Sequence, residues 1–276
     1  MNRCCKLLLK RKGAQMDLSE ITSFAFAGII SDYCAFFEES PIEVNISITQ
    51  NLFDGYKKIR PDLTESNLIS ADRINNNNGI TILPQSGDVF TILLSYEYLK
   101  ENMKSGKPDW LGTIAHELTH VYDYMEYKAI TGRSYGDMLE YQDNIVFVNW
   151  TEFNAKVKGY LFLRKNCFDD IYDRTQVSYI FDKELPFLTK NMIADYNESD
   201  NANEQLYTIS HFLAHFYVWQ HLFPNDFTDR VLDKMLGSNI WVKKLYHFFS
   251  DNRKLEDAIN NAEQFKNILR TNFKGI

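Results

Sequence analysis

Residues Pro108–Tyr127 have the sequence PDWLGTIAHELTHVYDYMEY, which is typical of one long helix. Asp109 follows Pro108 and can cap the helix, because its side chain accepts a hydrogen bond from a free backbone N–H. Apolar residues recur at the spacing of one helical face: Leu111, Ile114, Ala115, Leu118, Val121, Tyr122 and Met125. The stretch therefore predicts an amphipathic helix, and the other elements are interpreted around it.

His116 and His120 enclose the sequence His-Glu-Leu-Thr-His inside this helix. A separation of four residues puts both imidazoles on one face, about one turn apart. Two ring nitrogens at that spacing can bind one tetrahedral zinc ion with bonds of about 2.0–2.1 Å. Glu117 would lie beside the metal, where its carboxylate can accept a proton from a water that the metal acidifies to a pKa of about 7. The alternative is a helix with two structural histidines.

A catalytic zinc needs a third protein ligand, with the fourth position left for water. The best candidate is Glu152, in the sequence NWTEFNA of a second predicted long helix. Its apolar and aromatic neighbours predict a partly buried carboxylate, which needs a partner. A metal ion would be such a partner. The alternative is an ion pair with Lys156 or Lys158, which follow at helix-surface spacing.

Asp123 is the rival third ligand, because it follows His120 by three residues on about the same face. On a straight helix, Asp123 lies about 10 Å along the axis from His116, which is too far for a shared metal. We therefore expect Asp123 either to hydrogen-bond a metal-binding histidine or to lie at the surface.

These residues resemble those of the gluzincin metallopeptidases, in which HExxH on one helix is completed by a Glu on a later helix. HELTH is also the form of this motif in the thermolysin-like branch, and the sequence EFNA from Glu152 onward is similar to the E-[FY]-x-A of several branches. The resemblance implies that His116, His120 and Glu152 bind zinc and that Glu117 is the general base. It covers only about residues 110–160.

The resemblance also implies further groups around the metal. An edge strand, here residues 89–94, would pair with an extended peptide substrate. A histidine of a later helix would stabilise the tetrahedral oxyanion, and we expect His215, with His211 as the other candidate. Tyr207 and Tyr160 could take the same role, and the alternative for both histidines is simple packing.

One position departs from the gluzincin pattern. Those proteins usually carry an Asp four residues after the ligand Glu, where this chain has Lys156. The group that orients the metal ligands is therefore either absent or supplied from elsewhere in the fold.

The rest of the sequence predicts an α+β fold, with a small mixed or antiparallel sheet in the N-terminal half and a mostly helical C-terminal half. Strands are predicted at 42–49 and 89–94, and the turn sequence NNNNG separates two extended runs, 70–74 and 80–83. Helices are predicted over residues 17–37, 51–60, 143–165, 183–196, 202–222, 226–236, 239–249 and 254–270, with a short helical piece that ends at Met103.

Composition limits the class of protein. A hydrophobic fraction of 45% is ample for a packed core, and a net charge of −7 argues against nucleic acid as the main partner. The longest apolar stretch, residues 24–37, is too short to span a bilayer and contains Asp32, so no membrane segment is predicted. The four cysteines form no CxxC pair, which favours a reduced, cytoplasmic protein without a disulfide framework.

The predicted organisation has three parts. Residues 1–16 are interpreted as a leader, residues 17–170 as a core with the sheet and both long helices, and residues 171–276 as a helical subdomain. With the resemblance, this implies zinc-dependent hydrolysis of a peptide or protein substrate. The hypothesis from another class is a non-catalytic binding or regulatory protein stabilised by zinc, in which Asp123 or a third histidine closes the coordination sphere. The sequence predicts no oligomeric state.

Overall fold

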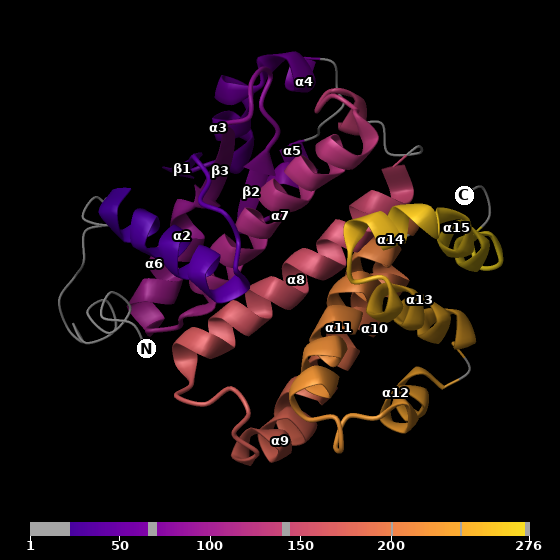
Figure 1. The fold of residues 1–276 in the computed structure, drawn as a ribbon. Coiled ribbons are helices and arrows are strands. Elements are labelled where there is room, and N and C mark those ends of the chain that lie inside the picture. Colours follow the sequence, from indigo (N-terminus) through magenta and orange to yellow (C-terminus); the bar gives the residue numbers. More distant parts are fainter. Residues whose placement is uncertain (1–22, 66–70, 140–143, 200, 238, 274–276) are drawn as a thin grey trace. The chain divides into compact units, whose positions relative to one another are not determined.

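The computed structural model describes residues 23–65, 71–139, 144–199, 201–237 and 239–273, and Figure 1 shows their fold. Three short strands and several helices make up the N-terminal half, and the described part of the C-terminal half consists of helices and the loops that connect them. The predicted α+β class is therefore confirmed.

The strands form one mixed sheet. They are β1 (Val44–Thr49), β2 (Gly79–Ile82) and β3 (Phe90–Ser95), in the spatial order β1-β3-β2. β1 pairs with β3 in parallel, and β2 pairs with β3 in antiparallel fashion. Most of β3 is buried, as expected for a central strand that is covered on both faces.

The prediction that residues 89–94 form an edge strand is wrong. Val44 of β1 lies opposite Phe90, and Gly79 of β2 lies opposite Leu94, so β3 is paired along both sides. The physical reason lies in the sequence itself, because Ile92, Leu93 and Leu94 are consecutive apolar residues and both faces of the strand must be buried. The edge strands of this sheet are β1 and β2.

Short helices accompany the sheet along the chain. They are α2 (Ser23–Phe37), α3 (Leu52–Ile59), α4 (Pro61–Glu65), α5 (Ala71–Asn75) and α6 (Tyr96–Ser105). The predicted helix start at residues 17–20 lies outside the described residues. The extended run predicted at 70–74 is wrong for residues 71–74, which are helical. There Ile74 is buried, and the Asn75 side chain accepts a hydrogen bond from the backbone N–H of Phe53 in α3 (3.0 Å).

Two long helices carry the residues that the sequence singled out. They are α7 (Asp109–Thr131) and α8 (Ile145–Cys167). α7 continues one turn beyond the predicted end at Tyr127 and stops before Gly132, whose φ of 68° interrupts the helix. α8 agrees with the predicted helix at 143–165 to within two residues at each end; residue 143 lies outside the described residues, and Asn144 forms a 3-10 turn just before the helix.

The C-terminal half consists of shorter helices. They are α9 (Thr175–Tyr179), the single π-helical turn η4 (Ile180–Glu184), α10 (Leu185–Glu198), α11 (Ala202–Leu222), α12 (Asp229–Leu236), α13 (Ile240–Asp251), α14 (Leu255–Asn260) and α15 (Ala262–Arg270). α10 and α11 lie side by side (Figure 1). The single helix predicted at 254–270 is wrong. Asn261 breaks it, and its side chain donates to the Asn252 side-chain oxygen (2.7 Å).

The chain forms two compact units. The first contains the sheet, the N-terminal helices, α7 as far as Met125 and α8 from Lys158 onward. The second contains residues 126–133, residues 137–157 and the chain from Asp170. The linear boundary near residue 170 stays a prediction.

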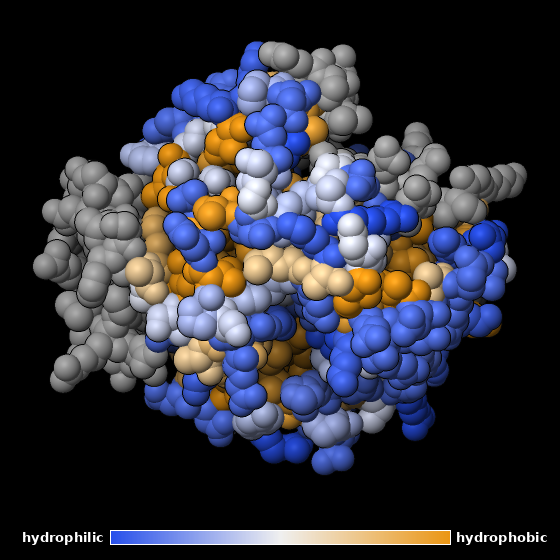
Figure 2. Space-filling view, turned by 45° about the horizontal axis from the view of Figure 1, so that its top comes forward, coloured by the Kyte–Doolittle hydropathy of each residue, from blue (hydrophilic) through white to orange (hydrophobic). Residues whose placement is uncertain are grey.

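Aromatic side chains fill the core of the second unit. Phe153 of α8 stacks on Phe249 of α13, with ring centroids 4.6 Å apart. Trp219 and Phe248 are also buried, so they belong to the same core. Hydrophilic residues cover much of the face shown in Figure 2, with smaller apolar patches between them. Among the described residues, every helix is too short or too polar to cross a membrane.

Candidate metal centre

The two histidines of α7 face each other across one turn. The Nε2 atoms of His116 and His120 are 3.0 Å apart, and their ring centroids are 4.6 Å apart. Two nitrogens bound to one tetrahedral zinc would be separated by about 3.3 Å, given bonds of about 2.0–2.1 Å. The pair is therefore close to the spacing that a shared metal requires.

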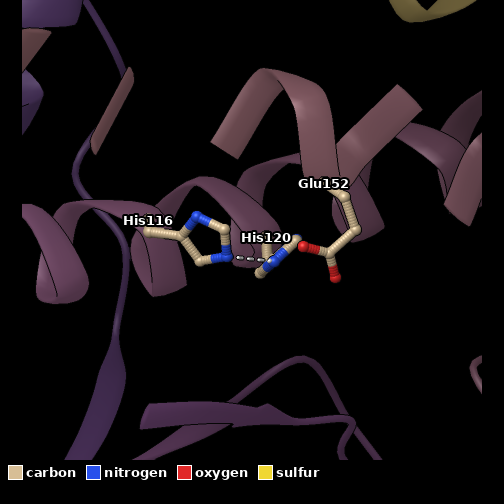
Figure 3. A group of neighbouring side chains, drawn as sticks. All are labelled: His116, His120 and Glu152. Carbon is tan, nitrogen blue, oxygen red and sulfur yellow. Dashed lines mark hydrogen bonds between the residues drawn. The ribbon is translucent and has the colours of Figure 1, made fainter. Parts of the chain in front are cut away.

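Glu152 of α8 completes a group of three ligand atoms. One atom each from His116, His120 and Glu152 lie within 4.8 Å of one another, and Figure 3 shows the carboxylate beside the two rings. Two imidazoles and one carboxylate are the donor set of a catalytic zinc site with three protein ligands. The Glu152 side chain is 21% exposed, so solvent can reach the group. These residues therefore fit a divalent metal ion, although imidazole also suits other transition metals.

A close helix crossing explains how Glu152 reaches α7. A Cβ atom on Gly159 of α8 would lie 2.7 Å from the backbone oxygen of Gly112 and 3.2 Å from the His116 Cβ, so only glycine fits there. Glu152 precedes Gly159 by seven residues, or about two turns, and therefore lies on the same face of α8. The face of α8 that approaches α7 is thus the face that carries the carboxylate.

Glu117 is held by the edge strand β2. The carboxylate is nearly buried, at 6% exposure, and its Oε2 accepts a hydrogen bond from the Thr81 hydroxyl (2.8 Å). The same hydroxyl lies 2.9 Å from the Glu117 backbone oxygen. At Gly79, an added Cβ would lie 3.2 Å from Thr113 and 3.3 Å from the Glu117 Cγ, so β2 runs close against α7. Strand and helix together fix the orientation of this carboxylate.

The opposite face of α7 is held by a buried hydrogen-bond chain. Thr119 donates to the Ala115 backbone oxygen (2.8 Å), so the Tyr33 phenol donates to Thr119 (2.8 Å). Burial raises the pKa of Tyr33 well above its usual value, and the charge of Asp123 acts in the same direction. Asp123 itself is 3% exposed, which excludes the surface position that the sequence left open. Among the described residues, Asp123 does not belong to the group of converging ligand atoms.

A histidine of α11 contacts the third ligand. The Nε2 atom of His211 lies 3.2 Å from the Glu152 Oε2. Burial lowers the pKa of His211 well below its usual value, and the charge of Lys156 adds to this effect. A neutral imidazole still carries one N–H, so His211 can donate a hydrogen bond to the carboxylate. The Tyr207 ring packs against this histidine, with ring centroids 4.0 Å apart.

The other candidates lie in different surroundings. His215 follows His211 by one turn of α11, and its ring centroid is 6.0 Å from that of Trp219. Its expected role at an oxyanion stays a prediction. The Tyr160 hydroxyl accepts a hydrogen bond from Arg164 (3.2 Å). Lys158 pairs with Glu39 (2.6 Å) and not with Glu152.

Sequence reasoning did not single out Thr81, and it preferred His215 to His211. The only sequence signal for Thr81 is its place between two isoleucines in a predicted extended run, which puts it on the opposite face from them. Nothing local shows that this face meets Glu117. His211 and His215 share a helical face, so their spacing alone cannot distinguish them.

No protein-family model, no curated protein and no solved structure matches this chain. The resemblance to gluzincins therefore rests on the residues of α7 and α8 described above.

Proposed function

We propose that this protein is a zinc-dependent peptidase. The observation that carries the proposal is the convergence of ligand atoms from His116, His120 and Glu152, with the Glu117 carboxylate one residue from the first ligand. The three ligands would hold the metal and leave one position for water.

Bound zinc would lower the pKa of water and polarise the scissile carbonyl. Glu117 accepts the proton of the attacking water and passes it to the leaving amine, so the same carboxylate acts first as base and then as acid. Thr81 keeps the carboxylate directed during both transfers, because its hydroxyl donates to Oε2. The burial of Glu117 strengthens its hydrogen bond with Thr81, since little water competes for the carboxylate.

The edge strand β2 is the proposed docking site for an extended peptide. β2 lies at the edge of the sheet, and its Thr81 contacts Glu117. A peptide that adds to this edge as a further strand would run beside the proposed general base. β2 therefore takes the peptide-pairing role that the sequence analysis expected of residues 89–94, most of which belong to the central strand β3.

The metal part of the proposal is tested by elemental analysis of the purified chain and its Glu152→Ala variant. We expect about one zinc per chain in the wild type and a sharp reduction in the variant. A wild type without zinc after reconstitution would refute the site.

The catalytic part is tested with Glu117→Gln, which removes the base and keeps the shape. We expect the variant to retain its zinc but to lose at least about 100-fold in hydrolysis of fluorescent casein and a quenched peptide library. Equal activity in both proteins would contradict the assignment of Glu117. Zinc binding without hydrolysis of any peptide by the wild type would instead support a non-catalytic, zinc-stabilised protein.

A further inference from the structure

The third ligand, Glu152, has a hydrogen-bond partner on another helix. Its Oε2 accepts from His211 of α11 at 3.2 Å, and both side chains are about one-fifth exposed. A glutamate has three side-chain torsions, so an untethered carboxylate would have to be ordered when the metal binds. A hydrogen bond to one oxygen reduces that cost, and a carboxylate has two oxygens that can act as acceptors or metal ligands.

His211 is itself held in place. The Tyr207 ring packs on it at 4.0 Å, and its neighbours Ser210 and Phe212 are buried in α11. α11 also packs on α8 close to Glu152, because the rings of Phe153 and Tyr217 lie 5.7 Å apart, edge to face. The imidazole is therefore packed against neighbouring side chains, which restrict the directions in which its N–H can point.

His211 is not one of the converging ligands. Within the described chain, the group of ligand atoms contains His116, His120 and Glu152 only. Since His211 touches the carboxylate but stands outside the group, its geometry is that of an outer hydrogen-bond donor.

We propose that His211 is a positioning residue that orients the Glu152 carboxylate for metal binding. This inference rests on the proposed metal site. Outer hydrogen-bond partners of this kind contribute about 10–100-fold to metal affinity in other metalloproteins.

The experiment is a zinc titration of the full-length chain in competition with a chromophoric chelator. His211→Ala removes the donor, His211→Gln keeps an N–H donor on a side chain of similar length, and His221→Gln changes an exposed histidine of the same helix. We expect a 10–100-fold weaker zinc affinity for His211→Ala, a value within about threefold of wild type for His211→Gln, and no change for His221→Gln. Zinc per chain at saturation should remain about one in all four proteins.

Two results would overturn the proposal. Wild-type affinity in His211→Ala would mean that the hydrogen bond does not orient the ligand. Equal weakening in His211→Gln and His211→Ala would mean that the imidazole itself binds the metal, and the cobalt(II) absorption spectrum would then change between wild type and His211→Gln.

The same titration separates this inference from the metal site on which it rests. A wild type that binds no zinc, or a Glu152→Ala variant that binds as tightly as wild type, refutes the site itself. If the wild type binds zinc tightly, Glu152→Ala loses binding and His211→Ala has no effect, then only the role of His211 is refuted. The melting temperature of the metal-free variants checks that each is folded.

Discussion

At the scale of single residues, Glu117, the proposed general base, is hydrogen-bonded to a side chain that belongs to the sheet. The Thr81 hydroxyl is 2.8 Å from the Glu117 Oε2, and a hydrogen bond to a charged acceptor contributes roughly 1.5–3 kcal/mol. The bond both directs the carboxylate and stabilises its charged form. Thr81 is therefore part of the proposed catalytic machinery, although it does not belong to the group of converging ligand atoms.

Thr81→Val keeps the shape of the side chain and removes the donor. We expect kcat/KM for peptide hydrolysis to fall by about 10–100-fold, because the lost bond is worth roughly 1.5–3 kcal/mol. Zinc content should be unchanged. Thr81→Ser is the matched control and should retain most of the activity. Thr81→Val with activity within twofold of wild type would contradict the role of this hydroxyl.

At the scale of elements, we expect the close approach of α7 and α8 to determine whether the three candidate ligands can share a metal. Gly159 and Gly112 meet so closely that an added Cβ would lie 2.7 Å from a backbone oxygen, a distance that real Cβ contacts do not reach. The helix axes would have to separate to accept a larger residue. Glu152 lies seven residues from Gly159 along α8, so its carboxylate would move away from the histidines of α7.

Gly159→Ala should therefore weaken zinc affinity by at least about tenfold while the helix content stays the same. Alanine favours a helix interior by about 1 kcal/mol over glycine, so the local helix itself is not disrupted. Gly136→Ala is the control, because its added Cβ would meet only the Ser134 Oγ, at 3.6 Å. Chelator competition measures the affinity, and circular dichroism measures the helix content. Unchanged zinc affinity in Gly159→Ala would show that the crossing does not set the ligand spacing.

At the scale of the whole molecule, separate sets of contacts hold the candidate ligands. The HExxH segment of α7 is fixed by the sheet through Thr81 and by α2 through Tyr33. The N-terminal part of α8 is fixed by the loop between α13 and α14, because the Trp150 indole donates to the Asn252 backbone oxygen (2.6 Å) and Arg253 donates to the Asn154 side chain (2.8 Å). A metal held by all three candidate ligands would bind the native state and not the unfolded chain.

Zinc should therefore raise the melting temperature of the chain. A ligand that binds only the native state at 100 times its Kd contributes about 2.7 kcal/mol, which corresponds to roughly 5 °C for a protein of this size. His120→Gln, which removes one ligand, should melt at the same temperature with and without zinc. Differential scanning calorimetry of the wild type and of His120→Gln, each with added zinc and with a chelator, measures these melting temperatures. A wild type whose melting temperature does not respond to zinc would contradict the site.

Local sequence patterns determined most elements and the three candidate ligands. Apolar spacing at a period near 3.6 gave α7, α8 and α11 within a few residues, because burial of one helical face leaves a regular trace in the sequence. HExxH needs only helix geometry to bring His116 and His120 together. Glu152 could be proposed because a carboxylate among apolar neighbours needs a partner.

Only the tertiary structure decided the rest. The strand order makes β2 an edge and β3 the centre, since pairing joins segments that are distant in sequence. His211 and His215 are equivalent in spacing, and only the packing of α11 on α8 places His211 against Glu152. Thr81 likewise meets Glu117 through the close approach of β2 to α7, where Gly79 leaves little room for a side chain. A local pattern records which face of an element is buried, whereas the partner of that face depends on contacts between elements that no local pattern records.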